Sequence, residues 1–209
     1  MGLSQDDALL SVNAQFTMGL SCYYGDGVAV DKAAAVEWFH KAAEQGHAKA
    51  QYNLGILYSN GDSVPSDAVA AVAWFHKAAA QGHADAQHQI GCAYSHGDGV
   101  AVDEAAAIEW FHKAAEQGHA KAQYNLGSAY YNGDGVPVDK AVAAEWFRKA
   151  ADQGHATAQY SLGRMHCTGD GVSVDGAAGF EWCRRAAQQG HARARSLPSS
   201  TWATWASWE

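Results

Sequence analysis

The sequence repeats every 36 residues, so the chain folds from one small unit that is used several times. The dipeptide Ala-Gln marks the period, beginning at Ala14, Ala50, Ala86, Ala122 and Ala158. The segment EWFHKAAEQGHAKAQYNLG begins at Glu37 and again, unchanged, at Glu109, two periods later. Duplication of two units and design by consensus would both leave this trace, and the sequence does not separate them.

The second half of each unit has the pattern of an amphipathic helix. In the third unit, apolar side chains recur at the spacing of one helical face, at Ala107, Trp110, Phe111, Ala114 and Ala115. Charged residues occupy the opposite face, where Glu109 and Lys113 form an i,i+4 pair. Asp103 is the expected N-cap of this helix, and Gly118 is the expected left-handed residue at its end.

The first half of each unit predicts another helix. In the fourth unit one helical face carries Ala122, Leu126, Gly127 and Tyr130. The following GDGV segment supplies Gly133 and Gly135, whose freedom at positive φ suits a tight turn. Each unit is therefore two short antiparallel helices, here called helix A and helix B in chain order. Neither helix can bury its apolar face alone, so the units must stack.

A glycine recurs in the middle of every helix A, at Gly19, Gly55, Gly91, Gly127 and Gly163. Glycine inside a helix costs about 1 kcal/mol relative to alanine. We expect close helix–helix approach to offset this cost.

Two motifs resemble the Sel-1-like repeat, a relative of the tetratricopeptide repeat: AQYNLGILYSNG, beginning at Ala50, and WFHKAAEQGHA, beginning at Trp38 and Trp110. The resemblance covers residues 14–193. It implies an all-α fold, a right-handed α-solenoid superhelix of five stacked two-helix repeats at 14–49, 50–85, 86–121, 122–157 and 158–193. It also implies an adaptor or scaffold for protein complexes, with helix A lining the concave face.

The two ends depart from the repeat. Residues 1–13 are expected to extend and cap the first helix, with Ser4 and Asp7 spaced as a capping box. In residues 194–209, Pro198 stands where the fourth repeat has Leu126, and the repeat stops there. Tryptophans then recur every third residue, at Trp202, Trp205 and Trp208. This tail is either a cap over the last repeat, a partner-binding motif, a self-association segment or non-native sequence.

Composition limits the partners. The net charge of -8 argues against nucleic acid and anionic membrane surfaces as partners. No apolar run is long enough to span a bilayer, and the N-terminal sequence lacks the pattern of a signal peptide, so we expect a cytoplasmic protein. The four cysteines occupy different positions of the repeat, which favours reduced thiols over a disulfide framework.

The sequence offers little for catalysis or metal binding. One histidine per repeat follows the glycine after helix B, at His47, His83, His119, His155 and His191, and we expect these side chains to be structural. His40, His76 and His112 form another column, replaced by Arg148 and Arg184, and are expected to be solvated. The Glu-x-x-His pairs at Glu37 and Glu109 lie two repeats apart, too far to share a metal cluster. We therefore predict no enzyme activity, no metal and no cofactor.

A binding surface is predicted on helix A. Three positions after its leading alanine, each repeat carries an amide or hydroxyl side chain: Thr17, Asn53, Gln89, Asn125 and Ser161. Seven residues further on are Asn60, His96 and Asn132, and nearby are Tyr23 and Tyr131. Amides donate and accept hydrogen bonds, so such a column suits an extended peptide backbone. The alternative is that these side chains only solvate the surface or pack between repeats.

Three functions follow. The first is a non-enzymatic adaptor that binds a peptide or protein on its helix-A face. The second is a small-molecule-binding or hydrolytic repeat protein. The third is a consensus-like scaffold without an evolved ligand. Variation at one helix-A position, which reads Leu20, Ile56, Cys92, Ser128 and Arg164, favours the first. Oligomeric state and the identity of the partner do not follow from the sequence.

Overall fold

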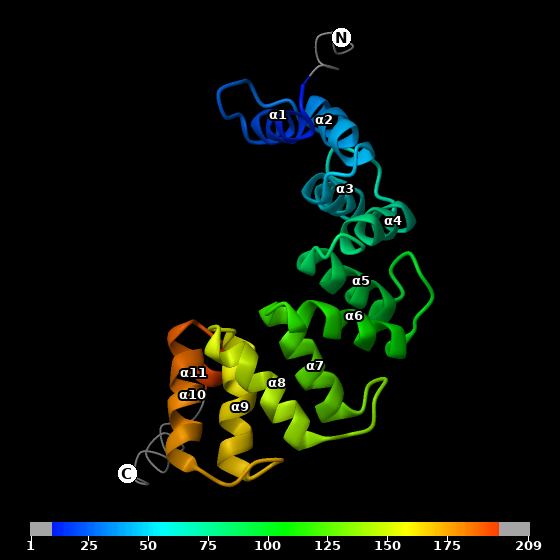
Figure 1. Ribbon diagram of the computed structural model, residues 1–209. Coiled ribbons are helices and arrows are strands. Elements are labelled where there is room, and N and C mark those ends of the chain that lie inside the picture. Colours follow the sequence, from blue (N-terminus) through cyan, green and yellow to red (C-terminus); the bar gives the residue numbers. More distant parts are fainter. Residues whose placement is uncertain (1–9, 197–209) are drawn as a thin grey trace. The chain divides into compact units, whose positions relative to one another are not determined.

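The protein is described by a computed structural model covering residues 10–196, and throughout that range its regular structure is α-helical (Figure 1). The helices are α1 (Val12–Tyr24), α2 (Lys32–Glu44), α3 (Ala48–Asn60), α4 (Ala68–Ala79), α5 (Ala84–His96), α6 (Glu104–Glu116), α7 (Ala120–Asn132), α8 (Lys140–Asp152), α9 (Ala156–Thr168), α10 (Gly176–Gln188) and α11 (Ala192–Arg195). The odd-numbered helices are helix A of their repeats, and the even-numbered helices are helix B.

The local signals of the sequence fix where these helices begin and end. Helix B follows an aspartate whose carboxylate accepts a hydrogen bond from a backbone N–H of the first turn, as Asp31 does from Ala34 at 2.9 Å. The expected positive φ angles are confirmed at Gly118 (85°), Gly133 (88°) and Gly135 (69°). In the second repeat Ser63 occupies the place of Gly135 and still has a positive φ, of 69°.

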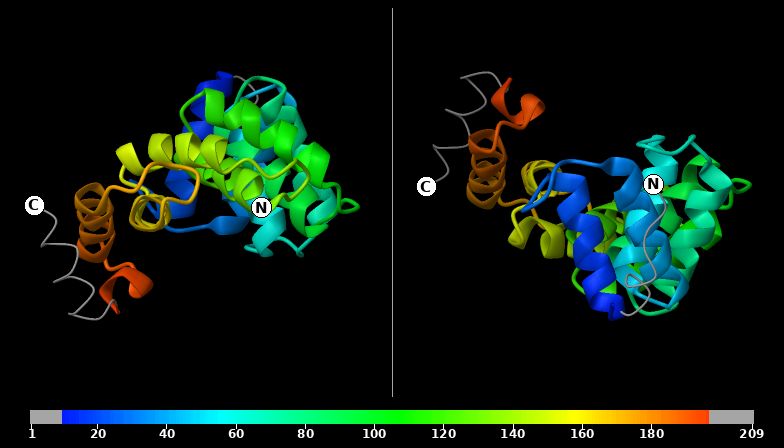
Figure 2. Two further views of the ribbon diagram at one scale, coloured as in Figure 1. Left: turned by 90° about the horizontal axis from the view of Figure 1, so that it is seen from below. Right: turned by 90° about the horizontal axis from the view of Figure 1, so that it is seen from above.

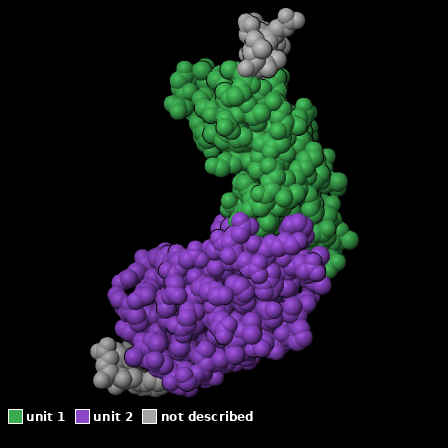
Figure 3. Space-filling view, in the orientation of Figure 1, with its two compact units in different colours: residues 1–103 green, residues 104–209 purple. Residues whose placement is uncertain are grey.

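The chain divides into two compact units, residues 1–103 and 104–209 (Figure 3). Unit 1 contains α1 to α5, and unit 2 contains α6 to α11. Within each unit, helix A packs on helix B of its own repeat, and helix B packs on helix A of the next, as α1, α2 and α3 do. The additional views in Figure 2 show helices joined by loops throughout the coloured part of the chain. The predicted all-α fold of stacked two-helix repeats is confirmed.

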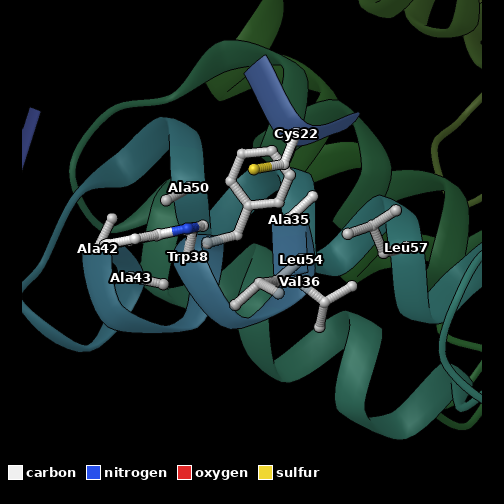
Figure 4. Close-up of a cluster of buried hydrophobic side chains, with 10 residues drawn as sticks. Cys22, Ala35, Val36, Trp38, Ala42, Ala43, Ala50, Leu54 and Leu57 are labelled. Carbon is white, nitrogen blue, oxygen red and sulfur yellow. The ribbon is translucent and has the colours of Figure 1, made fainter. Parts of the chain in front are cut away.

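The core of unit 1 gathers side chains from three successive helices (Figure 4). Cys22 of α1, Trp38 of α2 and Leu54 of α3 are all buried in this cluster. The mid-helix glycines make the packing possible. A Cβ atom at Gly19 would lie 2.6 Å from the ring of Phe39, and one at Gly127 would lie 2.6 Å from the ring of Phe147. The expected close approach is thus confirmed; the partner at these glycines is an aromatic ring of helix B, and at Gly163 it is the sulfur of Cys183.

A buried glutamine links neighbouring repeats. The side chain of Gln51 is 5% exposed, and its amide nitrogen donates to the carbonyl of Ala43 at 2.9 Å. Its oxygen accepts a hydrogen bond of 2.8 Å from the side chain of Gln81, which follows the next helix B. The same amide-to-amide bond joins Gln45 to Gln15, Gln153 to Gln123 and Gln189 to Gln159. The glutamine that marks the period therefore satisfies its own polar groups while joining two repeats.

At the start of the described chain, the first helix is capped by a side chain close to it in sequence. Helix α1 begins at Val12, and the Ser11 hydroxyl caps it by accepting from the N–H of Ala14 at 3.3 Å. The proposed capping residues Ser4 and Asp7 lie outside the described residues, as do Trp202, Trp205 and Trp208. Among the described helices, none has the length and hydrophobicity needed to cross a membrane.

Candidate functional site

The histidines between repeats are structural, as expected. The Nδ1 atom of His47 accepts a hydrogen bond of 3.1 Å from the backbone N–H of Ala50 and so caps α3. Its ring stacks on Phe16 of the preceding helix A, with the ring centroids 4.4 Å apart. Because burial disfavours the charged imidazolium, the pKa of this histidine is lowered, which keeps Nδ1 available as an acceptor. The equivalent rings at His83, His155 and His191 cap and stack in the same way.

The prediction that the histidines on helix B are solvated was wrong. His40 is half-buried, its Nε2 lies 3.2 Å from the hydroxyl of Tyr58, and its ring meets the edge of Trp74. In unit 2, His112 contacts Tyr130 and Trp146 in the same arrangement. These side chains join the faces of adjacent repeats, which a helical pattern within one repeat does not reveal.

The predicted binding residues are accessible to different degrees. In unit 1, Thr17 is exposed and Asn53 and Gln89 are half-buried. In unit 2, Asn125 and Ser161 are half-buried. The outer row, which consists of Asn60, His96 and Asn132, is exposed.

Several of these side chains form hydrogen bonds close to their own position in the chain. The hydroxyl of Thr17 donates to the carbonyl of Asn13 at 2.9 Å, and the side-chain amide of Asn132 donates to Asp134 at 3.1 Å. The Nδ1 atom of His96 lies 2.9 Å from the carbonyl oxygen of Cys92. The column is therefore not a uniform row of free amides.

Three pockets lie beside helix-A residues that are equivalent in the repeat; two lie between successive A helices, and the other lies mainly between α4 and α5. One, of about 90 Å³, lies between α1 and α3 and is lined by Asn53. Another, also of about 90 Å³, lies in the next repeat of unit 1 and is lined by Gln89. The largest, of about 190 Å³, lies between α7 and α9 in unit 2 and is lined by Ser161. Each pocket thus contains one member of the predicted polar column.

A cluster of tyrosine, aspartate and lysine lies beside two of these pockets. In unit 2 the hydroxyl of Tyr131 donates to Asp170 at 2.6 Å, and Lys140 donates to the same carboxylate at 2.6 Å. These two hydrogen bonds lower the pKa of Asp170, and the bond to the carboxylate raises the pKa of Tyr131. In unit 1 the same cluster is formed by Tyr23, Asp62 and Lys32. We call each of them a Tyr–Asp–Lys cluster.

The aspartate of this cluster was missed at the sequence level. Asp62 and Asp170 belong to the turn after helix A, where a glycine-rich segment explains an aspartate without further partners. Their hydrogen-bond partners lie 30 and 39 positions away in the chain. The signal that could have found them is the co-occurrence of Tyr and Lys in repeats one and four, followed by Asp in the next repeat.

The described residues include no metal-ligating cluster, and two of their thiols are unreactive. No cluster of three or more metal-ligating side chains lies in the described chain. The four cysteines are free thiols, and burial raises the pKa of Cys167 to about 11 and that of Cys183 to about 12. Such thiols stay protonated at neutral pH and are poor nucleophiles. The walls of the pockets carry hydroxyl, amide and aromatic groups.

Comparison with known proteins agrees with this architecture. The model of the Sel1 repeat family matches residues 12–47, 48–83, 84–119, 120–155 and 156–191. These matches follow the same period, in a frame that starts two residues before each leading alanine. No curated protein matches the chain.

Two solved structures resemble the chain at substantial identity. One is a protective antigen of uropathogenic Escherichia coli strains with an SLR fold, 40% identical, with a TM-score of 0.87 over 91% of this chain and 41% of that one. The chain thus spans less than half of that antigen. Another is a Sel1 repeat protein from Oxalobacter formigenes, 33% identical, with a TM-score of 0.84 over 92% of this chain and 76% of that one.

A more distant structure shares the fold alone: a Sel1 repeat protein from Klebsiella pneumoniae, 21% identical, with a TM-score of 0.56. The family match covers residues 12–191, and in each unit the repeats pack as pairs of helices, with a mid-helix glycine against Phe39, Phe75 or Phe147 and, in the last repeat, against Cys183. The chain therefore belongs to the Sel1 repeat family.

Proposed function

We propose that this protein is a non-enzymatic adaptor that binds a peptide or protein partner on its helix-A face. The observation that carries the proposal is the recurrence of a small pocket beside helix A, each lined by one residue of the polar column: Asn53, Gln89 or Ser161. The two pockets of unit 1, one repeat apart, match a ligand that is itself a chain with regularly placed side chains.

Pocket size favours this function over binding of a small molecule. The cavities of about 90 to 190 Å³ are smaller than the roughly 300–1,000 Å³ of pockets that enclose drug-sized ligands. Each can hold a side chain or a terminal group. Hydroxyls and amides on the walls can pair with a peptide backbone, and Tyr23 and Tyr131 provide amphipathic contact area. The negative net charge disfavours nucleic acid as the partner.

The proposal is tested with a peptide selected from a displayed random library on the purified chain. Its affinity is measured by calorimetry for the native chain and for the triple variant Asn53→Arg, Gln89→Arg, Asn125→Arg. The matched control is Glu37→Gln, Glu109→Gln, Glu145→Gln, which changes the net charge equally at exposed positions of helix B. Circular dichroism confirms that both variants are folded.

We expect the helix-A variant to lose at least about tenfold in affinity, because bulky cations at Asn53 and Gln89 obstruct two pockets and the cation at Asn125 interrupts the polar column, while the control binds like the native chain. Failure to select any peptide, or equal losses in the two variants, would contradict the proposal. If both variants retain affinity and removal of residues 197–209 abolishes it, the binding site lies in the Trp-rich tail instead.

A further inference from the structure

The pocket of unit 2 differs in chemistry from its counterpart in unit 1. In the pocket between α1 and α3, the facing positions on the two A helices are Leu20 and Ile56. In the pocket between α7 and α9, the equivalent positions are Ser128 and Arg164. Both pockets have a Tyr–Asp–Lys cluster at one side. A polar and charged pair therefore replaces an apolar pair on an otherwise similar frame.

The guanidinium of Arg164 has no hydrogen-bonded partner in the protein, although its charge helps to lower the pKa of Asp170. Among the described residues, its guanidinium forms no hydrogen bond and no ion pair, and the side chain is exposed at the pocket. The nearby carboxylate of Asp170 is already engaged by Lys140, at 2.6 Å, and by the hydroxyl of Tyr131. Lysine and aspartate neutralise each other, so the pocket carries one uncompensated positive charge.

The walls of the pocket supply hydrogen-bond donors beside that charge. Ser128 and Ser161 present hydroxyls that form no hydrogen bond within the described part of the chain. A carboxylate has two acceptor oxygens, and guanidinium groups bind carboxylates through two parallel hydrogen bonds. Serine hydroxyls can donate to the same oxygens.

We propose that the pocket between α7 and α9 binds a carboxylate group of the peptide partner, with Arg164 as its principal donor. This inference rests on the proposed function and specifies the chemistry of one subsite. A single free guanidinium matches a monoanion. A phosphate group would bring additional negative charge next to the carboxylate of Asp170, so we infer that the pocket disfavours phosphate. The carboxylate can be the C-terminus of a peptide or the side chain of Asp or Glu.

The test uses small probes on the full chain, so it does not depend on finding the partner. Heteronuclear NMR follows the side-chain Nε–Hε signal of Arg164 during titration with N-acetyl-diglycine, with N-acetyl-glutamate N-methylamide, and with the uncharged N-acetyl-diglycine amide. The first two probes separate a terminal from a side-chain carboxylate. Inorganic phosphate is the competing anion. The Arg164→Ile variant assigns the signal, and Ile56 shows that isoleucine fits this place in the repeat.

We expect a saturable shift with at least one carboxylate probe, with a dissociation constant on the order of millimolar, and binding of the amide that is at least about tenfold weaker. Arg164→Ile should abolish binding, monitored through the backbone amides of Ser128 and Ser161. Lys121→Gln removes a charge from an exposed position of α7 and should leave it unchanged. Equal binding of the amide, tighter binding of phosphate, or binding that survives Arg164→Ile would overturn the inference.

A reciprocal variant makes the test independent of any loss of folding. Leu20→Ser combined with Ile56→Arg gives the unit 1 pocket the serine and the arginine of the unit 2 pocket, with the amide of Asn53 in place of the hydroxyl of Ser161 and beside its own Tyr–Asp–Lys cluster. This variant should gain a carboxylate site in unit 1, seen as new shifts at the Ile56→Arg position, and no gain would count against the inference. If a selected peptide loses affinity in the helix-A triple variant but not in Arg164→Ile, the adaptor function stands and the carboxylate site is wrong.

Discussion

The pockets of unit 1 and unit 2 share the same packed helices, here called the frame, and differ in the side chains that line the pocket. Between α1 and α3, and again between α7 and α9, an aromatic ring of helix B, Phe39 or Phe147, lies at the pocket beneath a mid-helix glycine. At the open side, Leu20 and Ile56 in one correspond to Ser128 and Arg164 in the other. The repeat thus separates residues that hold the helices together from residues that vary the chemistry of the pocket.

The pocket in the second and third repeats lacks the Tyr–Asp–Lys cluster that lies beside the other two pockets. There Ser59 stands in the place of Tyr23, and Ala68 stands in the place of Lys32, so no Tyr–Asp–Lys cluster forms although Asp98 is present. The helices α3, α4 and α5 nevertheless pack in the usual order. The cluster is therefore an addition to the repeat and not a condition for stacking.

The largest effect should come from the shared frame. Phe39→Ala and Phe147→Ala each remove a buried ring that packs against a glycine, and each should lower the free energy of unfolding by about 3–5 kcal/mol. Urea denaturation of the two variants measures both losses. If one substitution proved nearly neutral while the other had the full effect, the packing of Phe39 in unit 1 and of Phe147 in unit 2 would not be equivalent.

A smaller effect is expected from the Tyr–Asp–Lys cluster. Tyr131→Phe removes the hydroxyl that donates to Asp170, and because the pair is partly exposed we expect a loss of about 1 kcal/mol in unfolding free energy. Tyr94→Phe, at a tyrosine outside any such cluster, is the comparison. Chemical denaturation at neutral pH measures both. A neutral Tyr131→Phe would show that Lys140 alone satisfies the aspartate.

The same cluster gives stability a dependence on acid pH. Folding lowers the pKa of Asp62 and Asp170, so their contribution is fully present above the ordinary aspartate pKa and is lost as the pH falls through the lower folded value. The double variant Asp62→Asn, Asp170→Asn should flatten the melting temperature measured across this acidic range. An unchanged profile would mean that the hydrogen bonds do not favour the ionised carboxylates.

The histidine caps act at a higher pH and in both units. Burial lowers the pKa of His47, His83, His155 and His191, so each favours folding while neutral. Their contribution is fully present above the unfolded pKa of about 6.5 and is lost as the pH falls through the lower folded pKa values. Melting temperatures should therefore fall between about pH 7 and about pH 5. His83→Asn and His155→Asn retain a capping side chain without a titratable ring and should weaken that fall.

The smallest effect concerns one turn. Ser63 holds a positive φ of 69° where four other repeats have glycine. Ser63→Gly should raise the free energy of unfolding by about 0.5–1 kcal/mol, because the left-handed conformation is strained for serine. Gly99→Ser is the opposite test, since a Cβ there would lie 2.3 Å from the carbonyl oxygen of Ala68 and should destabilise. Thermal melts of both variants measure these changes. A Ser63→Gly variant that melts below the native chain, or a Gly99→Ser variant that melts above it, would contradict the prediction.

The sequence was a good guide within one repeat and a poor one between repeats. Periodicity and caps predicted the helices, and the left-handed Gly118 and Gly133 were foreseen, because these signals act over a few residues. The contacts of His40 with Tyr58 and Trp74 were not foreseen. They depend on how far one repeat is rotated and shifted against the next, which an amphipathic pattern leaves undetermined.

The candidate site was predicted only in outline for the same reason. The polar column of Asn53, Gln89 and Ser161 was found from its spacing, and each of the three lines a pocket. Arg164 was noticed only as a varied position. Its significance comes from Asp170 being paired already with Lys140, a pairing between positions 30 residues apart that belong to different repeats.

The buried glutamines bear on how such a chain can change its length. Every junction within a unit uses the same bond, from the glutamine side chain of helix A to a carbonyl near the end of the preceding helix B, so a whole inserted repeat would find an acceptor on one side and supply one on the other. An insertion of any other length would leave a buried amide unpaired, at a cost of about 1–3 kcal/mol. We therefore expect the chain to tolerate whole inserted repeats better than insertions of other lengths. At the equivalent position after Ala194 the chain has the exposed Arg195 in place of a glutamine, and the series of buried glutamines ends there.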